Sequence, residues 1–361
     1  MSEPVKRNTR RPQVGRLLFC LALVMFALSL WRAHDTGMNV WSHARRYGGL
    51  QQLIQTSDGL AAVQLYRDRV LWIQNSRVDG LSFERPMRLV PDGEGGVYVL
   101  GMLSSKVGRI LPDGVRGNDT VFPANYCITA LLPEDDGVWA AGYRLGLAED
   151  EAKDIFYFPE YHKHEWFLQW FPGKLPSGEV RLRDAIRFED EVWHEETAGN
   201  WHLLATHDRL LVVNDQAESI HCLTRSGDHV IWRAATKKRP VAAVRWGDRL
   251  IVASGQSGVV EAFRLDNGGH LWSMNVATGL VDMIVADNVL IAADRAHDQL
   301  IVIDPLEGKV VREVDLAGGP HGLLLDGGNL VIGLDSANRL VWLNRKFKTE
   351  KQLDLAAEVR P

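Results

Sequence analysis

Residues 288–314 read NVLIAADRAHDQLIVIDPLEGKVVREV, in which three short apolar runs alternate with polar segments. The runs are rich in β-branched residues, which favour strands, whereas the polar segments contain the Asp, Asn, Pro and Gly that favour tight turns. A further apolar run at 281–285 precedes this stretch. The pattern therefore predicts four short antiparallel strands within about 40 residues.

This unit occurs four times in the second half of the chain. The polar turns between its first two predicted strands recur about 40 residues apart, at Asp208, Asp248, Asn288 and Asn329. Four strands per about 40 residues is the period of a β-propeller blade. No stretch in this part of the chain sustains the apolar period of a helix.

Weaker copies extend the pattern toward the N-terminus, near residues 50–85, near 86–124 and after 128. The sequence therefore predicts an all-β fold, a seven-bladed β-propeller over residues 50–355, followed by a tail at 356–361.

The interval between the polar turns at 136 and 208 is longer than one period. We expect it to hold an insertion at about 144–163, after which strands resume at 165–171 and 179–183. Eight blades is the alternative, if the interval contains a further blade.

The N-terminal region has a basic tail, residues 1–16, followed by an uncharged apolar run, residues 17–31. This order is typical of a cleaved signal peptide or of an uncleaved signal anchor. The best cleavage site, at 27–29, would cut inside the apolar run, whereas Trp31 followed by Arg32 is typical of an interfacial anchor. We expect one transmembrane helix in the inner membrane, with a cytoplasmic N-terminus, a linker at 32–49 and the propeller in the periplasm. Secretion after cleavage is the alternative.

Composition excludes several classes of protein. The net charge is −5 although the N-terminal tail is basic, so the remainder is acidic and nucleic acid is not an expected partner. The 3 Cys residues rule out a disulfide-rich scaffold. Cys127 and Cys222 fall on different predicted blades, and we expect two buried thiols rather than a pair. The usual hydrolase and nucleotide motifs are absent.

Two segments resemble known propeller repeats. The stretch 301–311, which leads to Gly-Pro-His-Gly at 319–322, resembles the repeat of YVTN-type seven-bladed propellers. The stretches 225–232 and 265–272 are similar to PQQ-like repeats, in which a turn Gly precedes a strand that bears Trp. The resemblance implies a propeller. It implies no single activity, because these families include quinoprotein enzymes, dehydrogenase subunits and scaffolds of the outer-membrane-assembly type. The chain resembles the scaffolds more than the enzymes, because no catalytic Asp, cofactor stack or calcium site is evident.

The insertion is the most individual part of the sequence, and it would project from one rim of the disc. Most of the 12 Trp residues fall at or beside predicted strands, where they fill the space between blades, whereas Trp166, Trp170 and Trp193 lie in the irregular blade near the insertion. Aromatic side chains form hot spots at protein interfaces. The alternative is that they pack against their own blade. The candidate partner-binding residues are Tyr157, Phe158, Tyr161, His162, His164, Trp166 and Trp170.

His321 is the candidate for the central channel, because Gly-Pro-His-Gly precedes an innermost predicted strand. His162 and His164 have the spacing of two metal ligands, but no third ligand follows at a supporting distance. We therefore expect no metal, no cofactor and no catalytic residue.

These observations predict a non-catalytic, membrane-anchored periplasmic propeller. It would act as a protein-binding scaffold or accessory subunit, with another membrane or envelope protein as its partner. The alternatives are a propeller enzyme of the lactonase or dehydrogenase-subunit kind, with its site in the central channel, and a propeller that binds a glycan or a small molecule.

Overall fold

The computed structural model describes residues 49–74, 77–102, 104–144, 165–182, 185–188, 201–215, 217–276, 278–355 and 359–360. The chain divides into two units, Met1–Arg46 and Tyr47–Pro361, and all described residues belong to the second. The predicted basic tail, anchor and most of the linker lie outside the described residues. Among the residues that are described, no helix is long and apolar enough to cross a membrane.

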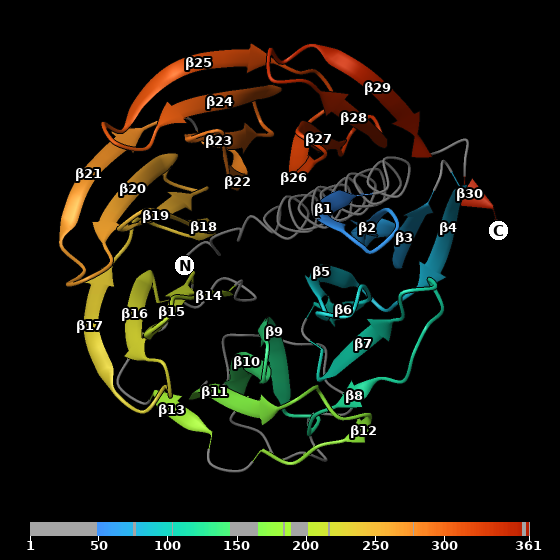
Figure 1. Ribbon diagram of the computed structural model, residues 1–361, viewed down its shortest axis with the longest axis vertical. Coiled ribbons are helices and arrows are strands. Elements are labelled where there is room, and N and C mark those ends of the chain that lie inside the picture. The colour runs from blue at the N-terminus through green and yellow to red at the C-terminus, as the bar shows by residue number, and fades with distance from the viewer. Residues whose placement is uncertain are drawn as a thin grey trace, which may run out of the picture. The chain divides into compact units, whose positions relative to one another are not determined.

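Seven mainly antiparallel sheets form a ring around a central channel, as Figure 1 shows. The predicted seven-bladed β-propeller is therefore confirmed, and the eight-bladed alternative is wrong.

We letter the blades A to G in chain order. Blade A contains β1 (Leu50–Gln55), β2 (Leu60–Gln64), β3 (Arg69–Gln74), β4 (Arg77–Ser82) and β30 (Val359–Arg360), with the short helix η1 (Leu65–Arg67) between β2 and β3. Blade B contains β5 (Pro86–Pro91), β6 (Val97–Gly101), β7 (Lys106–Ile110), β8 (Thr120–Val121) and β12 (Gly178–Glu179).

Blades C to G each have four strands, and the first strand of each lines the channel. Blade C contains β9 (Tyr126–Glu134), β10 (Gly137–Arg144), β11 (Glu165–Pro172) and β13 (Ile186–Phe188). Blade D contains β14 (Trp201–Ala205), β15 (Arg209–Asn214), β16 (Ser219–Thr224) and β17 (Val230–Ala235). Blade E contains β18 (Pro240–Trp246), β19 (Arg249–Ser254), β20 (Val259–Arg264) and β21 (His270–Asn275). Blades F and G contain β22 (Leu280–Ala286), β23 (Val289–Asp294), β24 (Gln299–Asp304), β25 (Lys309–Asp315), β26 (Pro320–Asp326), β27 (Asn329–Leu334), β28 (Arg339–Leu343) and β29 (Thr349–Asp354).

The repeated polar turns connect the first and second strands, as the sequence predicts. In blade F, Asp287 and Asn288 have φ of 45° and 65° and form a two-residue turn between β22 and β23. Positive φ at both central residues gives a twist that matches the flanking strands, and Asn and Asp tolerate it better than most residues. Gly327 and Gly328 form the corresponding turn of blade G, with φ of 55° and 85°.

Tryptophan side chains join successive blades. Trp232 of blade D donates its indole N–H to the Leu265 carbonyl of blade E at 3.0 Å, and its ring lies over Gly268, where a Cβ would come within 2.5 Å of the ring. Trp272 of blade E repeats this arrangement over Gly308 of blade F. Glycine is required at these turns because the ring occupies the place of a side chain and because φ is positive. These Trp residues are therefore part of the architecture.

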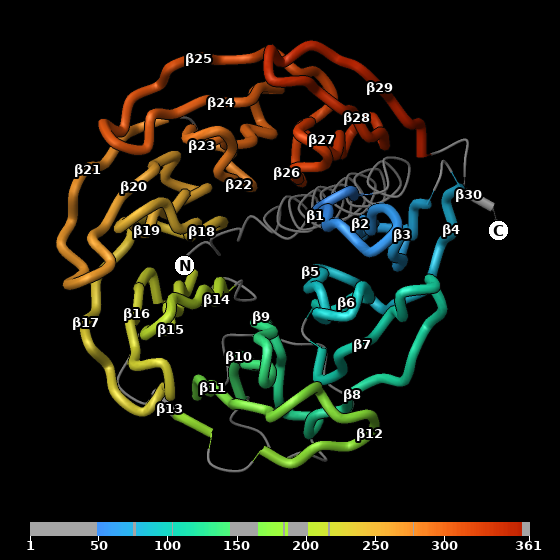
Figure 2. Tube along the Cα trace, viewed as in Figure 1, coloured from blue at the N-terminus to red at the C-terminus, as the bar shows by residue number. Residues whose placement is uncertain are grey.

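The ring closes through the C-terminus. Val359 and Arg360 pair in parallel with Val78 and Asp79, so β30 is the outermost strand of blade A, beside β4 in Figure 2. The end of the expected tail thus includes a strand that joins the C-terminus to the first blade.

A crossover joins blades B and C. After β11 the chain leaves blade C, and Gly178 and Glu179 pair in parallel with Thr120 and Val121 of blade B before β13 completes blade C. Strands resume at Glu165–Pro172 and at Gly178–Glu179, the second of them shorter than the predicted 179–183. The first strand after β11 belongs to blade B, because the edge of the short strand β8 accepts it.

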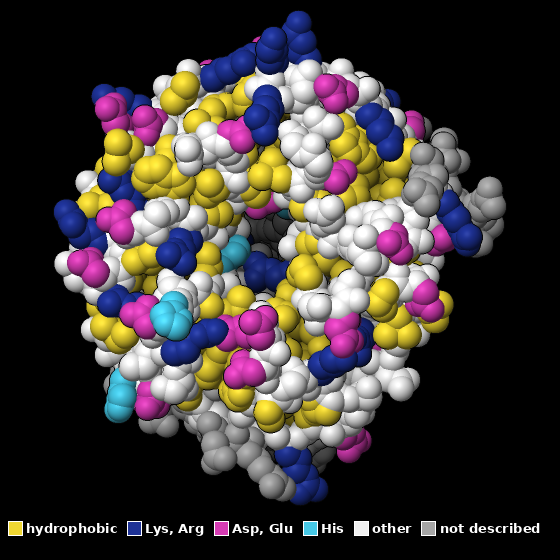
Figure 3. Space-filling model, in the orientation of Figure 1, with side chains coloured by type: hydrophobic (Ala, Val, Ile, Leu, Met, Phe, Trp, Pro, Cys, Tyr) yellow, Lys and Arg dark blue, Asp and Glu magenta, His cyan; other side chains and the backbone are white. Residues whose placement is uncertain are grey.

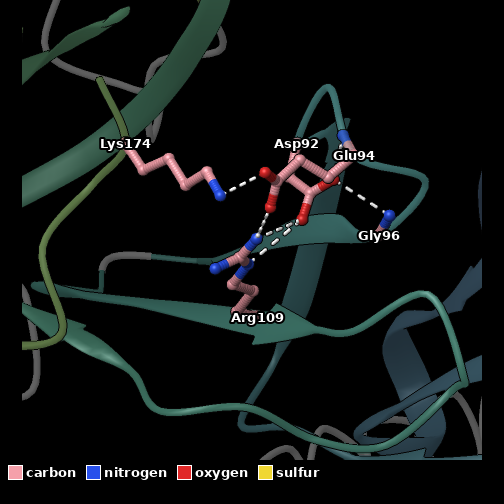
Figure 4. Close-up of polar contacts among 5 residues, drawn as sticks. All are labelled: Asp92, Glu94, Gly96, Arg109 and Lys174. Atoms are coloured by element: carbon pink, nitrogen blue, oxygen red, sulfur yellow. Dashed lines mark hydrogen bonds and ion pairs between the residues drawn. The ribbon is translucent and has the colours of Figure 1, made fainter. Parts of the chain in front are cut away.

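A cluster of charges fixes this crossover (Figure 4). Asp92, in the β5–β6 turn, accepts the backbone N–H groups of Glu94 and Gly96 at 2.9 Å each, and its other oxygen accepts Nε and Nη2 of Arg109 at 3.1 and 2.7 Å. Lys174, at the start of the crossover, forms an ion pair with Glu94. Every charge in this cluster therefore has an opposite charge beside it.

Candidate functional site

The central channel contains a cavity of about 430 Å³, lined by residues of the innermost strand of every blade. Most of the lining is apolar, and Figure 3 shows basic, acidic and histidine side chains bordering the central opening. Volume and composition are those of a small-molecule site. The polar lining residues are Gln51 and Gln52 of β1, Arg88 of β5, His202 of β14, Asp282 of β22 and His321 of β26.

The structure places His321, the channel candidate, on β26 with its side chain at the cavity. Its Nδ1 lies 2.7 Å from the carbonyl oxygen of Gln51 on β1. A carbonyl only accepts, so Nδ1 carries the proton and Nε2 keeps its lone pair. Burial, with a contribution from Arg295, lowers the pKa of His321 to about 4. The imidazole is therefore neutral at neutral pH and presents an acceptor.

His202, like His321, is a neutral imidazole that donates to a backbone carbonyl. One ring nitrogen donates to the carbonyl of Val241, and Nε2 is buried with no hydrogen-bond partner in the described part of the chain. Burial is the main cause of a pKa well below the ordinary value, and the nearby Arg88 guanidinium lowers it further. His202 is a second neutral imidazole, and the protein encloses its Nε2.

Arg88 is the cation of the cavity. It donates from Nη1 to the carbonyl of Trp201, and burial lowers its pKa, while Asp215 and Asp282 act in the opposite direction without forming an ion pair with it. Asp282 accepts the backbone N–H groups of Leu323 at 2.9 Å and Met283 at 2.8 Å. Burial nevertheless raises the pKa of Asp282 to about 6.

Sequence reasoning missed Arg88, His202 and Asp282. Each is a single polar residue within an apolar inner strand, as in Val281-Asp282-Met283-Ile284 and Met87-Arg88-Leu89-Val90. A charge that interrupts a strand lining the channel was the available signal. It was not decisive because the three residues are far apart in sequence and meet only when the ring closes.

The predicted partner-binding residues divide into two groups. Tyr157, Phe158, Tyr161, His162 and His164 lie outside the described residues. Trp166 is fully buried on β11, with its ring centroid 4.1 Å from that of Trp201 in blade D, and Trp170 lies 5.1 Å from Trp139. Both described Trp residues pack against the propeller, and partner contact by the insertion stays a prediction.

Two further expectations concern cysteine and metal. Cys127 and Cys222 are both buried and unpaired, and burial raises the pKa of the Cys127 thiol to about 11. This agrees with two inert thiols. Among the described residues, no group of three His, Cys, Asp or Glu side chains could hold a metal ion.

Comparison with known proteins identifies the repeat. Residues 177–322 match the family profile described as outer membrane protein assembly factor BamB. This part of the propeller is similar to PQQ-like repeats. The Trp–Gly contacts between its blades D, E and F lie within the matched part. No curated protein sequence matches the chain.

Solved structures of other propellers share its architecture. Virginiamycin B lyase from Staphylococcus aureus is 14% identical with a TM-score of 0.56, and the match covers 80% of this chain and 93% of the lyase. The dihydro-heme d1 dehydrogenase NirN is 13% identical with a TM-score of 0.54, covering 85% of this chain and 73% of NirN. The computationally designed Ika8 protein is 10% identical with a TM-score of 0.56, covering 85% and 87%. Such distant similarity establishes the fold and leaves activity open.

Proposed function

We propose that this propeller is a membrane-anchored, periplasm-facing scaffold that binds another envelope protein through the insertion of blade C. The observation that carries the proposal is the rigid root of that insertion. β10 and β11 pair in unbroken register from Gly137–Pro172 to Arg144–Glu165, so both ends of the segment 145–164 leave the disc side by side. An ion pair at 3.4 Å joins Arg144 to Glu165 at this point.

Both neighbouring blades support the hairpin. On the side of blade D, the ring of Trp166 packs against that of Trp201 at a tilt of 44°. On the side of blade B, the crossover that follows β11 is held by strand pairing to β8 and by the Lys174–Glu94 ion pair. A segment displayed from a base that is fixed on two sides loses less conformational freedom when it binds, and this favours recognition.

The match to an outer membrane assembly factor supports a scaffold in the cell envelope. The basic tail followed by the apolar run at 17–31 supports an anchored location. Anchoring would confine the disc near the membrane and raise its effective concentration for a membrane-bound partner.

Deletion of residues 146–162, with a short Gly-Ser linker in their place, tests the binding surface. The full chain is purified from mild detergent after cross-linking in cells, and co-purifying proteins are compared with those of the wild type. The matched control is Asp208→Ala with Asp248→Ala, two exposed turn residues on the opposite face of the disc. We expect the deletion alone to remove one or more envelope proteins. An unchanged set would contradict the proposal.

The location requires a separate test. An alkaline phosphatase fused after Pro361 is active only in an oxidising compartment, so an active fusion that remains with the membrane fraction is expected. An inactive fusion, or an active one released into the soluble fraction, would exclude the anchored periplasmic orientation.

A further inference from the structure

Arg88 is a partly buried cation that forms no ion pair with any residue in the described part of the chain. Its described contact is the hydrogen bond to the Trp201 carbonyl, and no carboxylate in the described part of the chain forms an ion pair with it. A guanidinium has five N–H donors, and most of those of Arg88 are left for another acceptor. Burying an unpaired charge is unfavourable, so a position of this kind is typical of a site that receives a ligand.

The neighbouring carboxylate does not neutralise Arg88. Asp282 uses its two oxygens to accept the backbone N–H groups of Met283 and Leu323, which belong to β22 and β26. These hydrogen bonds hold the carboxylate against the wall of the channel. Asp215 also acts on Arg88, so two carboxylates already lie near this one cation without forming an ion pair with it among the described residues. Their charge disfavours a dianion such as phosphate and favours a singly charged group as the ligand of the free Arg88 donors.

Two imidazoles belong to residues that line the cavity. His202 is on β14 of blade D and His321 is on β26 of blade G, each two blades away from Arg88 of blade B on opposite sides. Each imidazole donates from one nitrogen to a backbone carbonyl, of Val241 and of Gln51, and keeps a lone pair on the other nitrogen. A neutral imidazole lone pair accepts a hydrogen bond from a hydroxyl group and repels a carboxylate.

From this arrangement we infer that the central channel binds a small hydroxycarboxylate, whose carboxylate receives hydrogen bonds from the Arg88 guanidinium and one of whose hydroxyls donates to His321. The planar fork of Arg matches a carboxylate through two parallel hydrogen bonds. A cavity of about 430 Å³ accommodates a ligand of that size. The inference is independent of the proposed scaffold function, because the insertion and the channel share none of these residues.

Isothermal titration calorimetry on the detergent-purified full chain tests the inference with three probes. Gluconate carries a carboxylate and hydroxyls, sorbitol carries the hydroxyls alone, and propionate carries the carboxylate alone. We expect gluconate to bind at least about tenfold more tightly than either of the others, since a hydrogen bond to a charged group contributes that much. Absence of gluconate binding, or equal binding of sorbitol, would overturn the inference.

Variants assign the binding to Arg88. Arg88→Met is expected to weaken gluconate binding at least about tenfold, while the matched control Arg233→Met, on the exposed outer strand β17, leaves it unchanged. Thermal unfolding curves establish that each variant is folded. Should Arg88→Met fail to fold, Arg88→Lys keeps the charge and removes the fork, and an unchanged affinity in that variant would also count against the inference.

The pH dependence of gluconate binding provides an independent test of the inference. The titratable groups around Arg88 are Asp282 of β22, Asp215 and His202, with His321 across the cavity. Lowering the pH from about 7.5 to about 5 protonates Asp282, whose folded pKa is about 6, and removes one negative charge beside the ligand. We expect gluconate to bind several-fold more tightly at the lower pH in the wild type, and Asp282→Asn to bind tightly at both. Wild-type binding that is insensitive to pH contradicts this arrangement.

Discussion

Two arginines of blade B differ in whether they form ion pairs. Arg109 on β7 reaches the rim of the disc, where it pairs with Asp92 at 2.7 Å and with Glu94 at 3.1 Å. Arg88 on β5 reaches the channel, where it donates to one backbone carbonyl and forms no ion pair in the described part of the chain. Both side chains come from one sheet of the same small blade.

The contrast distinguishes charges that stabilise the fold from a charge that is left for a ligand. At the rim, Arg109 and Lys174 hold a turn and a crossover in place, and the cluster is complete without any other molecule. In the channel, Arg88 has no ion pair and Nε2 of His202 has no hydrogen-bond partner among the described residues. A fold that leaves polar groups unsatisfied in one place while it satisfies them elsewhere carries a local loss of stability, which is typical of binding sites.

The largest effect is expected from breaking the complete cluster. Asp92→Asn removes the charge that Arg109 contacts through two nitrogens, and the Asp92 side chain is fully buried. We expect the free energy of unfolding to fall by about 2–3 kcal/mol, because a buried charge loses its partner. Urea denaturation followed by Trp fluorescence measures the change.

The matched control is Asp79→Asn, which removes the exposed ion pair of Asp79 with Arg77 on blade A. Exposed pairs contribute little, so a change within about 0.5 kcal/mol is expected. Equal losses in the two variants would contradict the distinction drawn between a structural cluster and an ordinary surface pair.

The propeller itself could be predicted from the sequence because each blade repeats a local pattern. The Asp287–Asn288 turn and the Gly residues beneath Trp232 and Trp272 are short-range features of the chain. The crossover could not be predicted, because Gly178 and Glu179 pair with residues of another blade, and the strand pattern expected at 179–183 does not indicate which blade the strand joins.

Most of the polar residues of the channel could not be predicted from the sequence either. His321 could be proposed because Gly-Pro-His-Gly precedes an inner strand, whereas Arg88, His202 and Asp282 each look like one polar residue in an apolar run. They come from blades B, D and F, and only closure of the ring brings them to one cavity. Trp166 resembled a recognition residue for a similar reason, because its partner Trp201 lies on the next blade.

A smaller effect is expected from the pH dependence of the channel. The folded pKa of Asp282 is raised to about 6, so the unfolded chain binds fewer protons than the folded chain between about pH 4 and about pH 6. Stability is therefore lost as the pH rises through this window. Asp282 keeps some exposure to the cavity, so we expect a loss of about 1–2 kcal/mol. Asp282→Asn should remove this part of the pH dependence, and unfolding midpoints across the window measure it; an identical slope in the variant would contradict the assignment.

Replacing the unpaired cation should have the opposite sign to replacing Asp92. Arg88→Met removes a partly buried charge that forms no ion pair with a described residue, and it also leaves the Trp201 carbonyl without its donor. The first effect exceeds the second, so we expect the free energy of unfolding to rise by about 1 kcal/mol. Urea denaturation without added carboxylate measures the change. A loss comparable to that of Asp92→Asn would mean that Arg88 is structural, and would remove the contrast between the two arginines.

The smallest effect is expected at the outer edge of the rim cluster. Lys174→Met removes the ion pair to Glu94, but both side chains are 48% exposed, so solvent already screens their attraction. The strand pairing of Gly178 and Glu179 with blade B remains and continues to hold the crossover. We expect the urea midpoint to stay unchanged, in contrast to Asp92→Asn. A clear loss of stability would show that the cluster acts mainly by tying blades B and C together, whereas an unchanged midpoint places its contribution in the buried Asp92–Arg109 contact within blade B.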